Sequence, residues 1–393
     1  MIERRPMRIG LVGCGNIAVG HHIPAYLAMP ELATVVAVAD PAPARRELAI
    51  DALGLATSDA FDDGVELVER SDIDVLDVCT PPAYRTAVVR GALERGLPVL
   101  CEKPLATLPS TADELVIASR ETGTPIGLIH NYRLLPEIVR ARALIDAGEI
   151  GEPEVAILEF LGVEDRPGAA AYRPDWRHLA SVAGGGVLMD MVHVVYVAEV
   201  LLGQPINRIS AHVSARASGS PVEELALARY ETDGGVALVN VGWGVGPGGI
   251  AVSGPLGRIE IRNEGGATTP FRPPEELVLT RADGSVQRWD FPRDPAEPVP
   301  NVRLRMAILE FLDAVAEGAA PPVTAADGAH VLEVTLATYE AAALGRTVTL
   351  PLDHADPVYE RGLDGIRELD LPAWSPVVRG SLFGVGTQPS EDA

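Results

Sequence analysis

Cysteine is scarce in this chain. The 393 residues contain three cysteines, Cys14, Cys79 and Cys101, and none of them form a C-x-x-C pair. An odd number of cysteines without metal-type spacing argues against a disulfide framework and gives no reason to expect a metal site. Each cysteine stands in an apolar strand or turn context, so we expect three reduced, buried, structural thiols in a cytoplasmic protein.

Positive charge is also in short supply. The chain has 32 Lys and Arg against 55 Asp and Glu, which gives a formal net charge of -23 at pH 7. Nucleic acids and anionic membrane surfaces repel such a chain at long range. We therefore expect a small-molecule substrate as the partner, with no nucleic acid and no membrane.

Long hydrophobic runs are missing as well. A membrane-spanning helix requires roughly 18 apolar residues in succession, and the closest stretch, 187–202, is interrupted by Asp190, His193 and Glu199. Arg4 and Arg5 precede an apolar run and could mark an export signal. That run also contains the glycine turn described below, which cleavage would destroy, so the sequence predicts a soluble, cytoplasmic protein.

Short apolar runs alternate with helix-like stretches in the first third of the chain. Repeated strand and helix predict an α/β domain built on a doubly wound parallel sheet. The length and the 47% hydrophobic content suffice for two packed domains, and we place the first at residues 1–130. Its predicted strands are 8–12, 34–39, 75–79, 97–101 and 125–129.

Residues 131–351 are expected to form an α+β domain with a large, mostly antiparallel sheet. The strand-like runs follow one another without crossover helices, which is typical of antiparallel pairing. Residues 352–393 show no clear period and are expected to be an arm or tail. The predicted strands are 155–162, 206–215, 224–231, 237–245, 250–253, 257–262, 277–280 and 286–291, followed by helices at 302–317 and 325–344.

A glycine turn follows the first predicted strand. Gly13-Cys14-Gly15-Asn16-Ile17-Ala18 has the form G-x-G-x-x-A and opens a helix. Gly13 permits the tight turn, Gly15 lets the backbone approach a pyrophosphate, and Ala18 keeps helix and sheet close. Because the start of a helix also favours negative charge, the motif predicts a dinucleotide-binding site.

Asp40 ends the second predicted strand. A carboxylate there accepts hydrogen bonds from both ribose hydroxyls of the adenosine and repels a 2′-phosphate, which favours NAD over NADP. Arg45 and Arg46 leave NADP open, because either side chain could fold over the ribose. Two solvated arginines in the first turn of a helix are the simpler interpretation.

Lys103 follows a predicted strand that is apolar on both faces. Such a strand lies inside a parallel sheet, and open α/β sheets bind ligands at the carboxyl ends of their strands. Lys103 is therefore a candidate for contact with whatever reacts at the cofactor. A structural ion pair with Glu102 or Asp190 is the alternative.

These motifs resemble one family of nicotinamide enzymes, the glucose-fructose oxidoreductase, inositol dehydrogenase and rhizopine-catabolism (Gfo/Idh/MocA) family. The likeness extends over about residues 7–351. The segments that carry it, besides the glycine turn and Asp40, are Thr80-Pro81-Pro82, Glu102-Lys103-Pro104, His130-Asn131-Tyr132-Arg133, Gly148-Glu149-Ile150-Gly151, Trp176-Arg177, Gly184-Gly185-Gly186, Pro321-Pro322-Val323 and Asp327-Gly328.

The resemblance implies a Rossmann domain and a second domain whose open sheet mediates contacts in a homo-oligomer, such as a dimer or tetramer. It implies hydride transfer between NAD or NADP and a secondary alcohol of a sugar or cyclitol. It assigns to the cofactor site Gly13, Gly15, Asn16, Ile17, Asp40, Thr80, Pro81, Glu102 and Lys103.

The resemblance also places the acid/base element at Asp190-Met191-Val192-His193. Three residues advance a helix by about 300°, so both side chains would lie roughly 60° apart and face one cleft. His193 would take the hydroxyl proton, Lys103 would bind the same oxygen, and Asp190 would orient both. The family spacing is D-x-G-x-H, so this D-x-x-H departs from it; without the resemblance, His193 reads as a core histidine among valines.

Substrate contacts are expected from side chains that offer a hydroxyl-rich ligand an aromatic face or a fork of donors. Each of these side chains could equally pack at an interface. They are Tyr132, Arg133, Tyr172, Trp176 and Arg177.

Arg85 and the Lys103-Pro104 bond are two further features of the first predicted domain. Arg85 stands where the family often has the histidine of T-P-x-x-x-H, and it is assigned no role. The Lys103-Pro104 bond is a candidate for the cis form.

Two alternative functions stay open. One is redox-assisted chemistry on a glycoside with a retained cofactor, and the other is a non-catalytic nicotinamide or ligand sensor.

Overall fold

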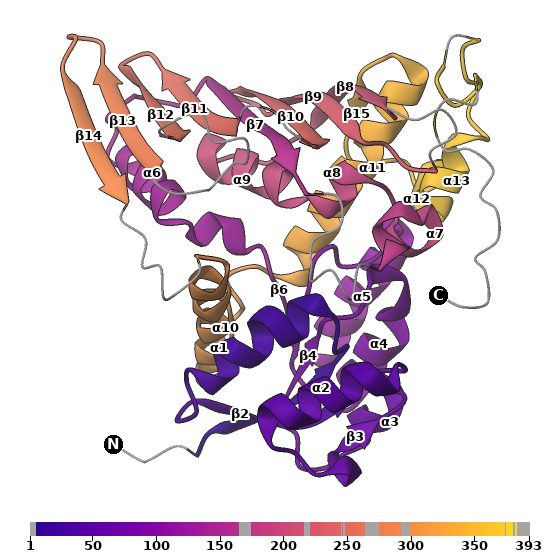
Figure 1. The fold of residues 1–393 in the computed structure, drawn as a ribbon. Coiled ribbons are helices and arrows are strands. Elements are labelled where there is room, and N and C mark those ends of the chain that lie inside the picture. Colours follow the sequence, from indigo (N-terminus) through magenta and orange to yellow (C-terminus); the bar gives the residue numbers. More distant parts are fainter. Residues whose placement is uncertain are drawn as a thin grey trace. The chain divides into compact units, whose positions relative to one another are not determined.

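Figure 1 shows a computed structural model of the chain, which forms two compact units. Unit 1 comprises residues 1–106, 111–131 and 295–329, and unit 2 comprises residues 107–110, 132–294 and 330–393. Residues 299–329 therefore belong to unit 1, although the sequence predicts that each domain is one continuous block. The structure describes residues 5–164, 174–215, 221–244, 246, 248–263, 275–291, 299–373, 375–379 and 382.

Unit 1 is built on a six-stranded sheet in the order β3-β2-β1-β4-β5-β6, with all neighbours parallel. Apolar residues on both faces of the central strands put them inside the domain. This order confirms the predicted doubly wound sheet and adds the short strand β3. The strands are β1 (Met7–Val12), β2 (Ala33–Ala39), β3 (Ala60–Phe61), β4 (Val75–Val78), β5 (Val99–Cys101) and β6 (Ile126–Leu128).

Helices connect these strands on both sides. The predicted helix after the glycine turn starts as a π-helical turn, η1 (Ala18–His22), and continues as α1 (Ile23–Leu27). The other helices are α2 (Pro43–Leu53), α3 (Gly64–Val68), α4 (Thr86–Glu94) and α5 (Pro109–Thr122), with 3-10 turns η2 (Thr57–Asp59) and η3 (Pro82–Tyr84).

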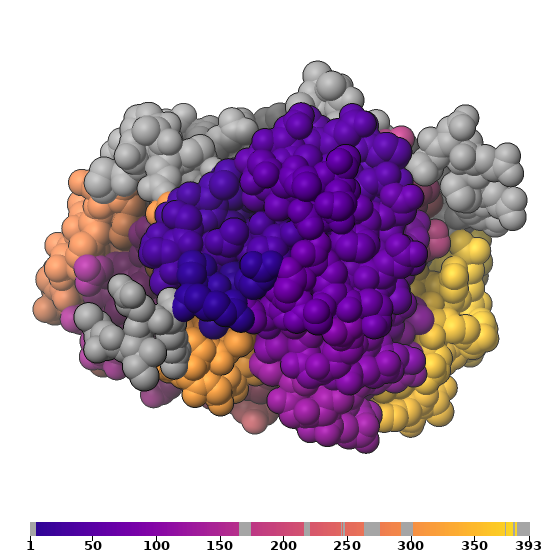
Figure 2. All heavy atoms as spheres, turned by 90° about the horizontal axis from the view of Figure 1, so that it is seen from below, coloured from indigo at the N-terminus to yellow at the C-terminus, as the bar shows by residue number. Residues whose placement is uncertain are grey.

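One helix from late in the chain completes unit 1. Helix α10 (Val299–Glu317) packs against η1 and α1. Its orange surface emerges beside the indigo surface of the N-terminal residues in Figure 2. Phe311 of α10 covers Gly127 of β6, where a Cβ atom would lie 2.3 Å from the Phe311 ring. The close fit explains why this edge of the sheet carries glycine.

Unit 2 contains a nine-stranded sheet in the order β14-β13-β12-β11-β7-β10-β9-β8-β15. Only the β10–β7 pair among these is parallel, so the mostly antiparallel sheet expected from the sequence is confirmed. The strands are β7 (Val155–Val163), β8 (Arg208–Ser214), β9 (Leu225–Glu231), β10 (Val236–Trp243), β11 (Gly248–Gly254), β12 (Gly257–Asn263), β13 (Glu275–Arg281), β14 (Val286–Phe291) and β15 (Val348–Thr349).

Helices α6, α8 and α9 lie along one face of this sheet (Figure 1). Alternate residues of β7, such as Leu158 and Phe160, are buried on that face, which is the period of a half-buried strand. The helices of unit 2 are η4 (Asn131–Leu134), α6 (Pro136–Asp146), η5 (Asp175–His178), α7 (Ala180–Ala183), α8 (Val187–Asp190), α9 (His193–Leu202), most of α11 (Ala325–Leu344), α12 (Pro357–Arg361) and α13 (Leu363–Ile366).

Within the described ranges, no individual helix has both the length and the apolar character needed to cross a membrane. The bent pair formed by 180–190 and 193–202 meets those two criteria only when its members are taken together.

Candidate active site

The glycine turn lies at the carboxyl end of β1. Gly13 has a φ of 93°, and a Cβ atom on it would lie 2.9 Å from the backbone of Cys79 and Thr80, so only glycine fits. A Cβ atom on Gly15, in contrast, would meet no protein atom within 4 Å. Gly15 thus leaves open space at the start of the helix, as a pyrophosphate requires.

Asp40 ties the turn to the end of β2. One carboxylate oxygen accepts a hydrogen bond from the Cys14 amide at 2.7 Å, and the other accepts one from the Ala42 amide at 2.8 Å. Asn16 and Ile17 follow in the turn, and Ile17 precedes η1. The acid is therefore fixed beside the dinucleotide motif, where its position was predicted.

Arg45 is buried and Arg46 is half-buried, so the simpler interpretation, two solvated arginines, is wrong. Arg45 is 8% exposed, and its Nε donates to the Cys14 carbonyl at 2.8 Å. Arg46 donates to the Asp40 carbonyl and pairs with Asp62 at 2.7 Å. Backbone carbonyls near the ends of strands need hydrogen-bond donors. Both guanidinium groups supply such donors and thereby hold the turn in place.

Thr80 and Pro81 follow β4, beside the glycine turn. The Thr80 hydroxyl oxygen is buried and has no hydrogen-bond partner in the protein. A buried hydroxyl without a partner is uncommon and points to a ligand group that would satisfy it. Together with the open space over Gly15, this hydroxyl makes the end of the sheet a good fit for a dinucleotide.

Arg85 holds the turn that presents Lys103. Its side chain is 1% exposed, and its guanidinium donates to the backbone carbonyls of Thr80, Glu102 and Pro104. The Lys103–Pro104 peptide is cis, as expected. Arg85, to which the sequence gave no role, therefore fixes the backbone on both sides of Lys103.

Glu102 faces inward rather than toward solvent. It is 7% exposed, and its carboxylate lies 3.2 Å from His22 Nε2 and accepts a 3.1 Å hydrogen bond from the Lys103 amide. Burial opposes its ionisation, but the hydrogen bond from His22 and nearby cations hold the pKa of Glu102 below its ordinary value. The carboxylate thereby anchors the lysine turn to the interior.

His22 lies between two carboxylates in the core of unit 1. Its Nδ1 is 2.7 Å from Asp77, while its Nε2 faces Glu102. Both ring nitrogens must donate to these acceptors, which describes an imidazolium ion. Although burial opposes the charge, Asp77 raises the pKa of His22 well above its ordinary value. Tyr26 donates to the same Asp77 oxygen at 2.8 Å.

The set His22, Asp77 and Cys79 is the one described group of three whose ligand atoms lie within 4.8 Å of one another. Burial raises the pKa of the Cys79 thiol, which disfavours the thiolate that a metal would bind. We interpret the set as a hydrogen-bonded network. All three cysteines are buried and free, as predicted, and burial raises the pKa of Cys14 to about 12.

Asp190 and His193 belong to unit 2 and lie on two different helices. Helix α8 ends at Asp190, Met191 has non-helical dihedrals, and α9 begins at His193. The predicted single helix over these residues is therefore wrong, and the 60° argument does not apply. The Asp190 carboxylate accepts a 2.9 Å hydrogen bond from Arg177 Nε.

Glu223, which the sequence did not single out, fixes the start of α8. Its fully buried carboxylate accepts hydrogen bonds from the Gly186 and Leu188 amides at 2.8 Å and from the Tyr339 hydroxyl at 2.9 Å. Burial raises the pKa of Glu223 to about 7. A Cβ atom on Gly186 would lie 2.0 Å from the Glu223 carbonyl oxygen, which explains the third glycine of the triplet.

An aromatic ring covers one face of His193. Its imidazole is 6% exposed and stacks on the Tyr132 ring, with centroids 4.3 Å apart and planes 2° from parallel. Arg177 lies over the Trp176 ring at 4.4 Å while it binds Asp190. Arg133 is half-buried in η4. Tyr172 lies outside the described residues.

The site residues thus form two sets. Unit 1 contains the glycine turn, Asp40, Thr80, Pro81, Glu102 and Lys103, and unit 2 contains Tyr132, Arg133, Trp176, Arg177, Asp190 and His193. In unit 2 the contacts join Tyr132 to His193 and Arg177 to both Trp176 and Asp190. Sequence reasoning missed His22, Asp77 and Glu223. A charged residue in the otherwise apolar strand Val75–Val78 was the one local signal for Asp77.

Comparison with known proteins agrees with this fold. Residues 7–130 match the family described as an oxidoreductase family with an NAD-binding Rossmann fold, and residues 138–267 match the C-terminal domain of the same family. The levoglucosan dehydrogenase of Pseudarthrobacter phenanthrenivorans is 26% identical over 402 residues, or 88% of this chain and 98% of that protein.

Inositol 2-dehydrogenase 4 of Saccharopolyspora erythraea is 28% identical over 309 residues, or 73% of this chain and 86% of that protein. The solved structure of levoglucosan dehydrogenase in complex with NADH and levoglucosan has the same fold. Its TM-score is 0.76 at 22% identity, over 88% of this chain and all (100%) of that one. With both of its domains matched, the chain is an NAD-binding oxidoreductase of the Gfo/Idh/MocA family.

Proposed function

We propose that this protein oxidises a secondary alcohol of a cyclic polyol, a sugar or cyclitol, with NAD as hydride acceptor. The names of its relatives support this substrate class, since levoglucosan is an anhydrosugar and inositol a cyclitol. The aromatic and arginine side chains of unit 2 also suit a ligand rich in hydroxyl groups.

The identity of residue 103 carries the proposal. Lys103 is the only lysine among the 32 basic residues of the chain; every other one is arginine. The one lysine of the chain follows a buried strand. It stands on a turn that Arg85 fixes through hydrogen bonds to three backbone carbonyls. A compact ammonium suits a single alcohol oxygen, whereas the planar guanidinium suits two acceptors at once.

Bound NAD would accept the hydride, and side chains of the protein would bind the alcohol oxygen and take up its proton. The Lys103 ammonium hydrogen-bonds the substrate oxygen and stabilises its developing negative charge. The His193 imidazole acts as the general base that accepts the hydroxyl proton. Asp190 acts with Arg177 as a positioning pair for this segment.

The cofactor is held by the glycine turn, with Asp40 on the adenosine ribose and the Thr80 hydroxyl as a donor or acceptor. The Asp40 carboxylate favours NAD over NADP, because a 2′-phosphate would meet a fixed negative charge. Tyr132, Arg133, Trp176 and Arg177 are the proposed substrate contacts. We place the protein in the cytoplasm, where three free buried thiols stay reduced.

We further propose that the protein is a homo-oligomer joined through the exposed face of its nine-stranded sheet. Leu227 and Leu238 are 38% and 40% exposed on neighbouring strands β9 and β10. Leu227 is opposite Asn240 and Leu238 is opposite Arg229, so the two leucines are diagonal neighbours on one face. Exposed leucines close together on a sheet are typical of an association surface.

Substitution of Lys103 tests the proposal. A panel of cyclitols, aldoses and glycosides, with NAD and NADP in parallel, first identifies an accepted substrate by the absorbance of reduced nicotinamide. We expect Lys103→Met to lower kcat on the order of 10³-fold, the size of loss seen when one group that stabilises a developing oxyanion is removed. Lys103→Arg keeps the charge and should still lose roughly 100-fold.

NAD affinity is the internal control, and both variants should bind NAD within about threefold of the parent by calorimetry. Exposed Arg120, changed to methionine, is the matched control for loss of a cation and should leave kcat unchanged. An unchanged kcat of Lys103→Met on an accepted substrate would contradict the role proposed for Lys103.

A further inference from the structure

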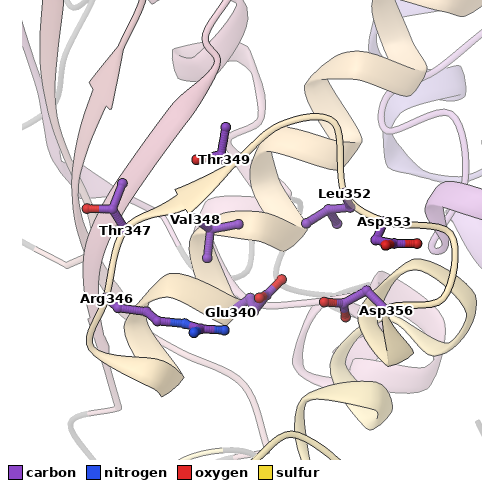
Figure 3. A pocket seen from close by; sticks show the side chains of 8 residues that line it. All are labelled: Glu340, Arg346, Thr347, Val348, Thr349, Leu352, Asp353 and Asp356. Atoms are coloured by element: carbon purple, nitrogen blue, oxygen red, sulfur yellow. The ribbon is translucent and has the colours of Figure 1, made fainter.

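A pocket of about 220 Å³ opens in unit 2 near the carboxyl end of α11. Strand β15 forms one wall and the loop that leads to α12 forms the other (Figure 3). Its lining includes three acidic side chains and one basic side chain. The lining residues are Glu340, Arg346, Thr347, Val348, Thr349, Leu352, Asp353 and Asp356.

Glu340 is the unusual member of this lining. Its side chain is 4% exposed, and its Oε2 atom is buried without a hydrogen-bond partner. In Figure 3 its carboxylate points into the pocket, toward the space between Val348 and Asp356. A buried acceptor without a donor costs free energy, so the pocket offers an unmet acceptor to a ligand with N–H or O–H groups.

The other two acids are held in place by the backbone. Asp356 accepts a hydrogen bond from the Val358 amide at 2.8 Å, and Asp353 accepts one from the Ala355 amide at 2.9 Å. Each of these bonds uses one oxygen of the carboxylate. With Arg346 as the opposing cation, the lining carries an excess of negative charge when all three acids are ionised.

The arrangement suits an organic cation better than a metal ion. Metal ions gather oxygen ligands at about 2.0–2.6 Å, so ligand atoms around one ion lie close together. Glu340, Asp353 and Asp356 do not form a described set of three within 4.8 Å. The buried side chains Val348 and Leu352 add apolar surface beside the acids, which a metal ion would not use.

We propose that this pocket binds the primary ammonium group of a small organic amine. The ammonium donates hydrogen bonds to the free Oε2 of Glu340 and to Asp356, and an alkyl stem packs on Val348 and Leu352. Asp353 lies at the rim, where it attracts a second positive charge. The site is independent of the NAD-dependent reaction, and no residue of it belongs to that machinery.

Calorimetry and ligand-observed NMR with 1,4-diaminobutane test the proposal on the full chain. We expect saturable binding with one site per chain, and Glu340→Gln should weaken it at least tenfold, because glutamine keeps the shape but loses the charge. Glu94→Gln, an exposed acid on α4, is the matched control and should bind like the parent. The thermal midpoint of each variant checks that it is folded.

The pH dependence gives a second readout. Burial and the nearby Asp356 raise the pKa of Glu340 to about 7, against the opposing effect of Arg346. The amine stays protonated across this range, so binding should be roughly tenfold weaker at pH 6 than at pH 8 and should release a proton near pH 7. The Glu340→Gln variant should show neither effect.

Three outcomes would overturn the proposal. One is equal binding by the parent and Glu340→Gln, which would describe diffuse attraction to an acidic surface. Another is binding of tetramethylammonium as tight as that of the diamine, since that ion has charge but no N–H donor. The third is binding of Ca²⁺ or Mg²⁺ with none of the diamine, which would make the pocket a metal site.

Discussion

Two acidic residues of this protein are buried where they need partners from distant parts of the chain. Asp77 stands inside strand β4, Glu223 lies beneath the start of α8, and both are fully buried. Each is tolerated because its oxygens accept hydrogen bonds from groups far away in the chain. In unit 1, His22, Asp77 and Glu102 thus form a network whose members depend on one another.

The Asp77→Asn variant tests this dependence. Removing one partner of a buried ion pair leaves the other uncompensated, so we expect a loss of about 3 kcal/mol in the free energy of unfolding, measured by urea denaturation at pH 7. Asp51→Asn, an exposed change on α2, should alter it by less than about 0.5 kcal/mol.

The His22–Asp77 pair also predicts how the stability of the protein depends on pH. Asp77 raises the pKa of His22, so the folded protein holds a proton that the unfolded chain releases near pH 6.5. This contribution is complete below about pH 6.5 and is lost as pH rises through the folded value. The parent should lose stability between pH 6.5 and pH 9 more steeply than Asp77→Asn, and parallel profiles would contradict the imidazolium assignment.

At the scale of elements, turns and helix breaks place the functional side chains. The Lys103 turn depends on Arg85, whose donors reach three carbonyls. The start of α8 depends on Glu223, whose carboxylate accepts hydrogen bonds from the Gly186 and Leu188 amides. The helix expected over Asp190 to His193 is interrupted at Met191, and the start of α8 is capped by a distant residue that a local pattern does not reveal.

A pair of glycine variants tests this element. Gly186→Ala places a methyl group against the Glu223 backbone, and we expect a loss of about 3 kcal/mol in unfolding free energy. Gly91 lies inside α4, and its nearest neighbour would be 3.8 Å from a new Cβ atom. Gly91→Ala should therefore be neutral or stabilise by up to about 1 kcal/mol, and equal losses in both variants would contradict the role of Gly186.

At the scale of the whole molecule, the chain combines a parallel sheet covered on both sides with a larger sheet that exposes leucines. Helices pack against one face of the nine-stranded sheet, while Leu227 and Leu238 remain exposed. A sheet of this size with apolar residues on its surface is expected to associate with a second copy. The proposed oligomer follows from that surface.

Replacing Leu238 with arginine tests the oligomer. A charge in the middle of an apolar interface should weaken self-association by roughly tenfold or more, seen as a smaller mass in light scattering. Leu256→Arg, at an exposed turn between β11 and β12, is the matched control and should leave the mass unchanged. A parent protein that is monomeric at micromolar concentration would contradict the proposed assembly.

The sequence by itself determined the features that arise within a short stretch of chain. The glycine turn, Asp40 at the end of β2 and Lys103 after β5 follow from strand, turn and helix patterns over a few residues. The alternation of strands and helices likewise determined the doubly wound sheet, and successive strands determined the antiparallel one.

Only the tertiary structure decided which distant residues meet. His22 and Asp77, Arg85 and the Lys103 turn, and Glu223 and Gly186 are separated in the chain and joined by hydrogen bonds in the core. A buried charge must find its partner wherever the fold supplies one, and a pattern along the chain does not say where that is. The same reason applies to Glu340, whose unpartnered oxygen becomes a candidate binding group only because folding buries it in a pocket.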